Sequence, residues 1–214
     1  MINIINMYFN YNIISRTIQV YEVRYMLIGI CGKSGSGKST LASKLMDLYK
    51  TAIHCDIDKI GHKALLDETV KKELINCFGE EIITGNKVDR KKLGNIVFAS
   101  PREMDKLTNI TWSYMQKEID NIIMSNNDKV IILDWVLLPK SKYFNKCKLK
   151  ILLDIPYEIR KERALIRDNI DEKAFKLRDD SSAPFNADDF NLVIKDNNQI
   201  NLERIVSLDR KSVV

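Results

Sequence analysis

The sequence is poor in the residues that stabilise small extracellular domains, with four cysteines among 214 residues. The cysteines form no C-x-x-C pair, and no histidine stands near them at the spacing of zinc ligands. We therefore expect no disulfide framework and a reducing, cytoplasmic location. No apolar run reaches the roughly 18 residues that a membrane helix needs, because Asp134 interrupts the longest run, Val130–Leu138. This absence predicts a protein without a membrane partner.

A large excess of charge of one sign is also lacking. The net charge is only +5, and the pI is about 8.9. This mild balance suits a phosphate-bearing small molecule and is too weak to indicate a nucleic-acid partner. Apolar residues make up 45% of the chain and the mean hydropathy is −0.22, values typical of an ordinary globular protein. The length fits one large domain, and the sequence leaves the oligomeric state open.

Residues 1–25 have no basic start before an apolar core, so we expect no signal peptide and interpret them as an N-terminal arm or extension. From Met26 onward, short apolar runs alternate with helical patterns. Strands are expected over residues 26–31, 51–55, 129–134, 149–154 and 192–195. Helices are expected over residues 38–49, 59–78, 90–98, 102–124, 157–168 and 202–211, and residues 171–190 are expected to be irregular. This alternation predicts an α/β fold with a parallel sheet.

A glycine-rich segment follows the first expected strand. Gly32–Ser39 reads GKSGSGKS and matches G-x-x-x-x-G-K-[ST], with a strand before it and a helix after it. Glycines let the backbone approach a ligand, and the N–H groups at a helix N-terminus bind phosphate. We expect Lys38 to reach the β- and γ-phosphates of ATP and the Ser39 hydroxyl to bind Mg²⁺. The predicted nucleotide-binding residues are Gly32, Lys33, Ser34, Gly35, Ser36, Gly37, Lys38, Ser39 and Thr40.

The rest of the chain narrows the class of nucleotide-binding protein. It has no Asn-Lys-x-Asp segment after a strand, as GTPases need, and no Leu-Ser-Gly-Gly-Gln signature of transporter ATPases. Arg160, Arg163 and Arg167 are spaced three and four residues apart and share one helix face. Arginines in this arrangement can clamp phosphates by bidentate hydrogen bonds, although Glu158 and Glu162 leave a solvated charged face as the alternative. We interpret the chain as a small-molecule kinase with an arginine-bearing lid.

Three aspartates follow expected strands, at the edge of the sheet where α/β proteins bind ligands. Asp56 and Asp58 follow the second strand, and we interpret Asp56 as a helix cap and Asp58 as the functional carboxylate, with the reverse order open. Asp134 ends the strand over residues 129–134, where a Walker B carboxylate lies near Mg²⁺. A turn residue at a strand end is the alternative for Asp134. Ser39 and Asp134 are the predicted metal ligands.

From Met26 onward the chain resembles the dephospho-coenzyme A kinases. The resemblance is carried by the segments IGICGKSGSGKST (28–40), DIDKIGH (56–62), FGEEI (78–82), VDRKKL (88–93) and RALIRD (163–168). It implies a three-layer P-loop NTPase fold over residues 26–214, with a helical acceptor insert near residues 62–124 and a lid near residues 160–190. It also implies ATP-dependent phosphorylation of the 3′-hydroxyl of dephospho-coenzyme A, the last step of coenzyme A biosynthesis.

The resemblance also implies roles for single residues. Asp58 would be the base that takes the hydroxyl proton, and Lys38 and Arg163 would be catalytic with it. Arg163 and Arg167 would be lid arginines at the transferred phosphoryl group. Arg90 would belong to the acceptor-side region.

Several positions depart from the family pattern, and outside the glycine-rich segment they lie on the acceptor or lid side. Val136 and Lys140 stand where the family has the proline and the glutamate of Pro-Leu-Leu-x-Glu, and Trp112-Ser113 replaces a His-Pro pair. A lid glutamine position falls among Asp179 and Asp180, and Lys33 replaces a P-loop glycine. Two alternatives therefore stay open: a related kinase for another nucleoside or nucleotide, and a nucleotide-binding protein without transfer activity.

Overall fold

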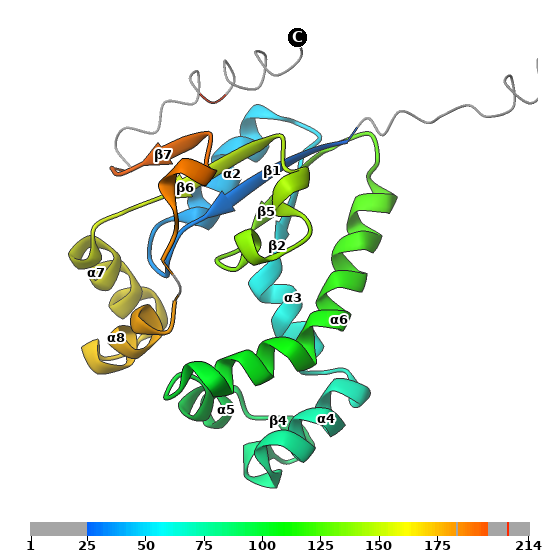
Figure 1. The fold of residues 1–214 in the computed structure, drawn as a ribbon, viewed down its shortest axis with the longest axis vertical. Coiled ribbons are helices and arrows are strands. Elements are labelled where there is room, and N and C mark those ends of the chain that lie inside the picture. Colours follow the sequence, from blue (N-terminus) through cyan, green and yellow to red (C-terminus); the bar gives the residue numbers. More distant parts are fainter. Residues whose placement is uncertain (1–24, 183, 197–204, 206–214) are drawn as a thin grey trace, which may run out of the picture.

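A parallel sheet lies at the centre of the computed structural model, which describes residues 25–182, 184–196 and 205 (Figure 1). Within these residues the sheet has five strands in the order β2-β5-β1-β6-β7, and each strand runs parallel to its neighbours. The strands are β1 (Met26–Cys31), β2 (Ile53–Asp56), β5 (Val130–Asp134), β6 (Leu149–Leu153) and β7 (Leu192–Ile194). The predicted α/β fold with a parallel sheet is confirmed.

Helices cover the sheet and extend beyond it (Figure 1). The helices are α2 (Lys38–Leu48), α3 (Ile57–Ala64), α4 (Glu68–Phe78), α5 (Arg90–Val97), α6 (Pro101–Ser125), α7 (Tyr157–Asp168) and α8 (Glu172–Asp180). A short hairpin, β3 (Ile83–Thr84) with β4 (Lys87–Val88), follows α4. Four 3₁₀ turns are also described, η1 (Glu80–Ile82), η2 (Leu138–Lys140), η3 (Phe144–Lys146) and η4 (Ala187–Asp189).

The strands are apolar because both faces of the sheet are buried. On one face, Leu41 and Leu45 of α2 pack against Ile28 and Ile30 of β1. On the other face, α6 contributes a second cluster that includes Met115, Ile119 and Ile123, and the loop after β5 completes this cluster. Alternate residues of each strand therefore face different helices, and the domain is layered around the sheet.

The prediction of a single helix over residues 59–78 is wrong, because two helices, α3 and α4, occupy this region. The carboxylate of Asp67 accepts hydrogen bonds from the N–H groups of Thr69 and Val70, which starts a new helix after a turn. The prediction of Gly79 as the C-cap is confirmed, with a φ of 85°. The helices α3 to α6 share a separate hydrophobic core that includes Leu74 and Leu93.

The prediction that residues 171–190 are irregular is also partly wrong, because this segment contains the helix α8. The Asp171 carboxylate caps this helix by accepting a hydrogen bond from the N–H of Ala174. Asn169, with a φ of 49°, turns the chain between α7 and α8. Phe175 is fully buried and packs against the ring of Tyr157. One buried aromatic residue thus anchors a helix whose other residues are mostly polar, a pattern too weak to read from sequence.

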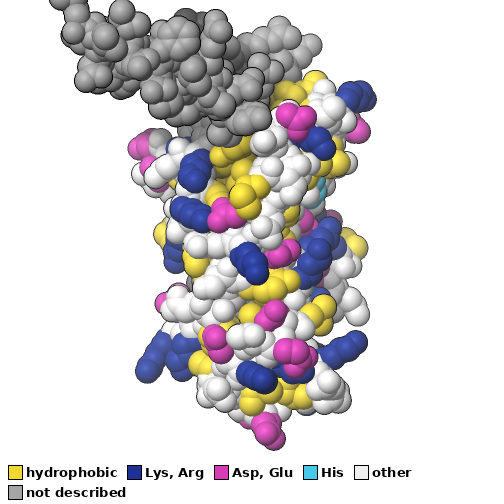
Figure 2. Space-filling model, turned by 90° about the vertical axis from the view of Figure 1, so that its right-hand side faces the viewer, with side chains coloured by type: hydrophobic (Ala, Val, Ile, Leu, Met, Phe, Trp, Pro, Cys, Tyr) yellow, Lys and Arg dark blue, Asp and Glu magenta, His cyan; other side chains and the backbone are white. Residues whose placement is uncertain are grey.

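Two predicted segments lie outside the described residues. They are the N-terminal arm over residues 1–25, apart from Tyr25, and the helix over residues 202–211, apart from Ile205. Among the described residues, no helix combines the length and the apolar character needed to cross a membrane. On the face drawn in Figure 2, lysine and arginine side chains are interspersed with acidic ones, so the positive charge is not gathered in one patch there.

Truncation of the core side of α6 should destabilise the domain. Ile119 is fully buried beneath the sheet, so Ile119→Ala should lower the free energy of unfolding by about 2–5 kcal/mol. Ile166→Ala is the matched control, because Ile166 is 78% exposed and surface changes usually cost within about 0.5 kcal/mol. Urea unfolding of both variants measures the difference. Equal stabilities would contradict the packing of α6 described here.

Candidate active site

The glycine-rich loop joins the end of β1 to the start of α2. Gly35 and Gly37 have positive φ values of 78° and 92°, which side chains rarely adopt. A Cβ atom on Gly35 would clash with the backbone oxygen of Arg160 in α7, so the loop also needs glycine for its close packing. Gly37 precedes the first residue of α2, Lys38, and the loop therefore ends at a helix N-terminus, which favours anions.

Asp134 lies at the end of β5 beside this loop, as predicted, and its side chain is only 4% exposed. The Ser39 hydroxyl donates a hydrogen bond to Asp134 Oδ2 at 3.0 Å. His54 Nε2 lies 3.3 Å from the same oxygen. An ionised carboxylate only accepts hydrogen bonds, so this contact requires that His54 carries its proton on Nε2. The alternative of a simple turn residue does not describe Asp134, which is buried and held from two sides.

His54 was not predicted as part of the site. It belongs to β2, which pairs with β5 so that Asp56 stands opposite Asp134. Alternation along the strand places His54 on the same face as Asp56, next to the Asp134 side chain. The pairing of β2 with β5 joins segments far apart in the chain, so the sequence alone carried no signal for this contact.

The oxygen atoms of Ser39 and Asp134 fit a magnesium ion that arrives with phosphate groups. Mg²⁺ prefers hard oxygen ligands and is usually held by one or two protein groups, with phosphate oxygens and water completing its shell. The described residues contain no cluster of three or more His, Cys, Asp or Glu residues that could hold a metal by themselves. The donor set therefore fits a shared ion better than a closed protein site.

Asp56 and Asp58 have different positions at the start of α3. The Asp56 carboxylate accepts a hydrogen bond from the N–H of Lys59 at 3.1 Å and caps the helix, as predicted. Asp58 lies in the first turn; part of the residue is exposed, but protein atoms crowd its carboxyl from several sides and withdraw much of the surrounding water. Removal of water by the surrounding protein raises the pKa of Asp58, the Asp134 and Asp56 carboxylates raise it further, and the Lys38 and Arg167 charges oppose this rise. Asp58 thus lies within electrostatic reach of the glycine-rich loop, Asp134 and α7.

The three arginines of α7 have different surroundings. Arg167 Nη2 lies 3.4 Å from Ser34 Oγ in the loop, and Asp168 pairs with the Arg167 guanidinium. Arg163 is exposed, and its side chain makes no hydrogen bond or ion pair with the described residues. The expectation that Arg160 also clamps phosphate is wrong. Its side chain is only 7% exposed, and it donates to protein oxygens instead.

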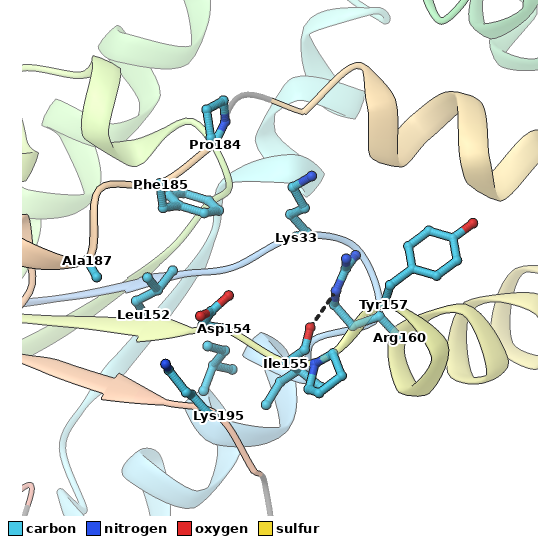
Figure 3. Close-up of a pocket in the computed structure, with 12 residues that line it drawn as sticks. Lys33, Leu152, Asp154, Ile155, Tyr157, Arg160, Pro184, Phe185, Ala187 and Lys195 are labelled. Atoms are coloured by element: carbon cyan, nitrogen blue, oxygen red, sulfur yellow. Dashed lines mark hydrogen bonds between the residues drawn. The ribbon is translucent and has the colours of Figure 1, made fainter.

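A cavity of about 550 Å³ opens on the other side of the loop, at the ends of β6 and β7 (Figure 3). Its lining includes Lys33, Asp154, Tyr157, Phe185 and Lys195. Because β1 lies between β2 and β6 in the sheet, the glycine-rich loop separates this cavity from Asp58. The volume lies in the range that small-molecule sites usually have.

The residues of α6 and of the segment after β5 that differ from the family pattern pack in the core or line a second cavity. Trp112 of α6 packs against Trp135, with their ring centroids 5.2 Å apart. Val136 and Lys140 line a smaller cavity with Phe185 and Phe190. On the helical side, Arg90 Nη2 donates to His62 Nε2 at 2.8 Å and joins α5 to α3.

Comparisons with known proteins agree with one another. A family model described as dephospho-CoA kinase matches residues 26–201. The dephospho-CoA kinase of Aquifex aeolicus is 38% identical over 156 residues, which cover 71% of this chain and 77% of that protein. The dephospho-CoA kinase of Fusobacterium nucleatum is 33% identical over 153 residues, 69% of this chain and 76% of that protein. The crystal structure of TT1252 from Thermus thermophilus has a similar fold, with a TM-score of 0.70 at 22% identity, and covers 89% of this chain and 99% of its own.

The electrostatic surroundings of Asp58 give a measurable expectation. Its carboxyl should titrate above the ordinary range of an aspartate, because desolvation outweighs the Lys38 and Arg167 charges. Removal of one of these charges in Lys38→Met should raise the pKa further. Lys44→Met is the control, since Lys44 is an exposed residue of the same helix. Carboxyl ¹³C shifts followed by NMR over a pH series measure the three values. An unshifted Asp58, or a lower pKa in Lys38→Met, would contradict the geometry.

Proposed function

The chain belongs to the dephospho-CoA kinase family, and we propose that Asp58, Lys38 and Arg163 carry its phosphoryl transfer. The protein is an ATP-dependent kinase that phosphorylates an alcohol group of a small molecule, dephospho-coenzyme A, in the last step of coenzyme A biosynthesis. The family model and the relatives carry one description, and neither favours a different acceptor or a protein without transfer activity. The observation that carries the assignment of Asp58 and Lys38 is the convergence of Asp58, Lys38, Asp134 and Arg167 beside one glycine-rich loop. Arg163 is included because the family resemblance implies it and because it lies one helical turn before Arg167 on α7.

The donor side of the proposed reaction is the glycine-rich loop with the cavity beside it. Residues 32–40 would bind the triphosphate through backbone N–H groups at the start of α2, and Lys38 would contact the β- and γ-phosphates. Ser39 and Asp134 would hold Mg²⁺, which neutralises phosphate charge when bound. His54 would keep the Asp134 carboxylate oriented toward Ser39. The adenosine part would occupy the cavity beyond Lys33.

The acceptor side is the region around Asp58 and the helices that follow it. Asp58 would accept the proton of the acceptor hydroxyl as that oxygen attacks the γ-phosphorus. A pKa above the ordinary range makes Asp58 a better proton acceptor than a fully solvated aspartate, provided that the pH is high enough to ionise it. The cavity for the donor nucleoside and Asp58 lie on opposite sides of the loop, which suits in-line attack. The helical region near residues 62–124, with Arg90, would bind the acceptor.

The proposed lid, near residues 160–190, consists mainly of α7 and α8. Asp168 pairs with Arg167 and also with Arg178, so the two helices are tied together. Arg163 and Arg167 would stabilise the charge of the transferred phosphoryl group, and closure over it would exclude water. A cytoplasmic location stays a prediction from the cysteine pattern.

A direct assay tests the function and its acceptor. The purified chain with MgATP and dephospho-coenzyme A should release ADP and form coenzyme A, followed by a coupled ADP assay and by the mass of one added phosphoryl group. Adenosine and AMP, each offered as the acceptor, are the comparison. Turnover with either of these and none with dephospho-coenzyme A would overturn the assigned acceptor.

Variants of Asp56 and Asp58 can show which of these two aspartates is the catalytic base and which only caps the helix. Asp58→Asn should lower kcat by at least about 100-fold, because general-base catalysis contributes roughly that much, and it should leave stability nearly unchanged. Asp56→Asn is the matched change and should keep most of the activity, since asparagine also caps helices. Initial rates at saturating substrates and thermal unfolding measure both effects. The reverse pattern of activity loss would identify Asp56 as the base.

A further inference from the structure

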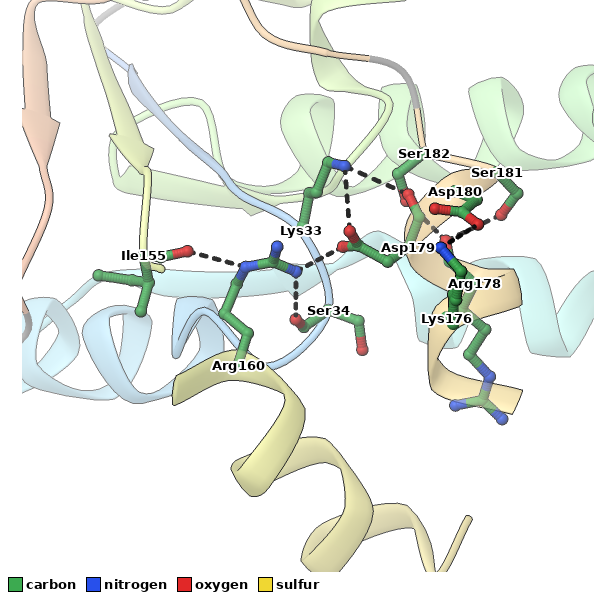
Figure 4. A network of polar contacts seen from close by, with 10 residues as sticks. All are labelled: Lys33, Ser34, Ile155, Arg160, Lys176, Arg178, Asp179, Asp180, Ser181 and Ser182. Atoms are coloured by element: carbon green, nitrogen blue, oxygen red, sulfur yellow. Dashed lines mark hydrogen bonds and ion pairs between the residues drawn. The ribbon is translucent and has the colours of Figure 1, made fainter. Parts of the chain in front are cut away.

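A buried carboxylate of α8 connects the proposed lid to the glycine-rich loop (Figure 4). The Asp179 side chain is only 10% exposed and accepts a hydrogen bond from Arg160 Nη1 of α7 at 2.5 Å. Lys33 Nζ of the loop lies 3.4 Å from Asp179 Oδ2 and donates to the Asp179 backbone oxygen at 3.2 Å. Two cations from two different elements therefore converge on one carboxylate, and the Lys33 side chain is directed toward α8.

Arg160 extends this connection to the backbone of the loop. Its Nη1 also donates to the backbone oxygen of Ser34 at 3.3 Å, and its Nε donates to the backbone oxygen of Ile155 at 2.8 Å. Gly35 packs directly on the backbone of Arg160. Residues 33–35 thus touch the unit of α7 and α8 through a lysine side chain, a backbone oxygen and a glycine.

Asp179 keeps its charge in this position. Burial alone would raise the pKa of its carboxyl, but the hydrogen bond from Arg160 and the charges of Arg160 and Lys33 outweigh this and lower the pKa. Loss of the carboxylate would leave the buried Arg160 without its acidic partner and would free Lys33 to move. The loop at residues 33–35 would then lose the contacts that hold its conformation against α7 and α8.

We propose that Asp179 is a positioning residue for ATP binding, which acts through Lys33 and Arg160 on the glycine-rich loop and does not touch the nucleotide itself. The inference rests on the proposed nucleotide site. Lys33 is then a link between the loop and α8, and its side chain is not a direct phosphate ligand. A lid helix therefore contributes to donor affinity before any acceptor is bound.

The test measures ATP binding directly and separately from turnover. Asp179→Asn removes the charge of the carboxylate with little change of shape. Lys33→Met removes the ammonium group that pairs with Asp179, and because the Lys33 side chain is 27% exposed this change should disturb the fold little. Each variant should weaken ATP binding about tenfold, as loss of a charge-assisted contact implies, while KM for dephospho-coenzyme A stays unchanged. Asp180→Asn is the control, because Asp180 pairs only with Lys176 among the described residues.

The double variant Lys33→Met/Asp179→Asn decides how Lys33 acts. If Lys33 works through Asp179, the double variant should bind ATP about as weakly as either single variant, since the second change removes nothing more. Effects that multiply would show that Lys33 contacts phosphate by itself and would overturn the proposal. If Asp179→Asn binds ATP as tightly as the wild type does, the proposal is overturned too. The proposed function is unaffected by that result if the wild-type protein phosphorylates dephospho-coenzyme A. Wild-type protein that binds no ATP would overturn both.

Discussion

The candidate site depends on the parallel pairing of β1 with β5 and β6. Because all carboxyl ends meet at one edge, the loop after β1, Asp134 at the end of β5 and α7 after β6 face a common space. The pairing of β2 with β5 adds Asp58 at the far side of the same edge. An antiparallel neighbour would have moved one of these groups to the opposite end of the sheet. The order of strands, more than any single residue, places the cavity beside β6 and β7 on one side of the loop and Asp58 on the other.

Within that space, opposite charges are interleaved. Asp58 lies within electrostatic reach of two other carboxylates, Asp56 and Asp134, and of two cations, Lys38 and Arg167. This mixture explains why a modest net charge is compatible with the proposed triphosphate site: the cations of the loop and of α7 are balanced by carboxylates nearby. The same interleaving raises the pKa of the Asp58 carboxyl, because desolvation and two like charges outweigh the two cations.

The parts of the protein that were predicted correctly are those with local patterns. Strands buried on both faces are continuous apolar runs, and the glycine-rich loop has a fixed spacing, so these features could be predicted from the sequence. The contacts of Asp179 could not, because Lys33 lies 146 residues away and nothing local marks the pair. The split between α3 and α4 was missed because the helical apolar pattern continues across the turn before Asp67, although the cap residue itself was visible. The site residues assigned on the family resemblance stay predictions, with the geometry in their support.

The contact between Trp112 and Trp135 has a practical consequence. These are the two tryptophans of the chain, and their rings pack against each other at a tilt of 36° where α6 meets the end of β5. The intrinsic fluorescence of the protein, excited at the red edge of the indole band, therefore originates from one place, where α6 meets the end of β5. The glycine-rich loop and α8 contribute no indole emission of their own. The protein carries a built-in optical reporter for movements of its helical half relative to the sheet, with no label attached.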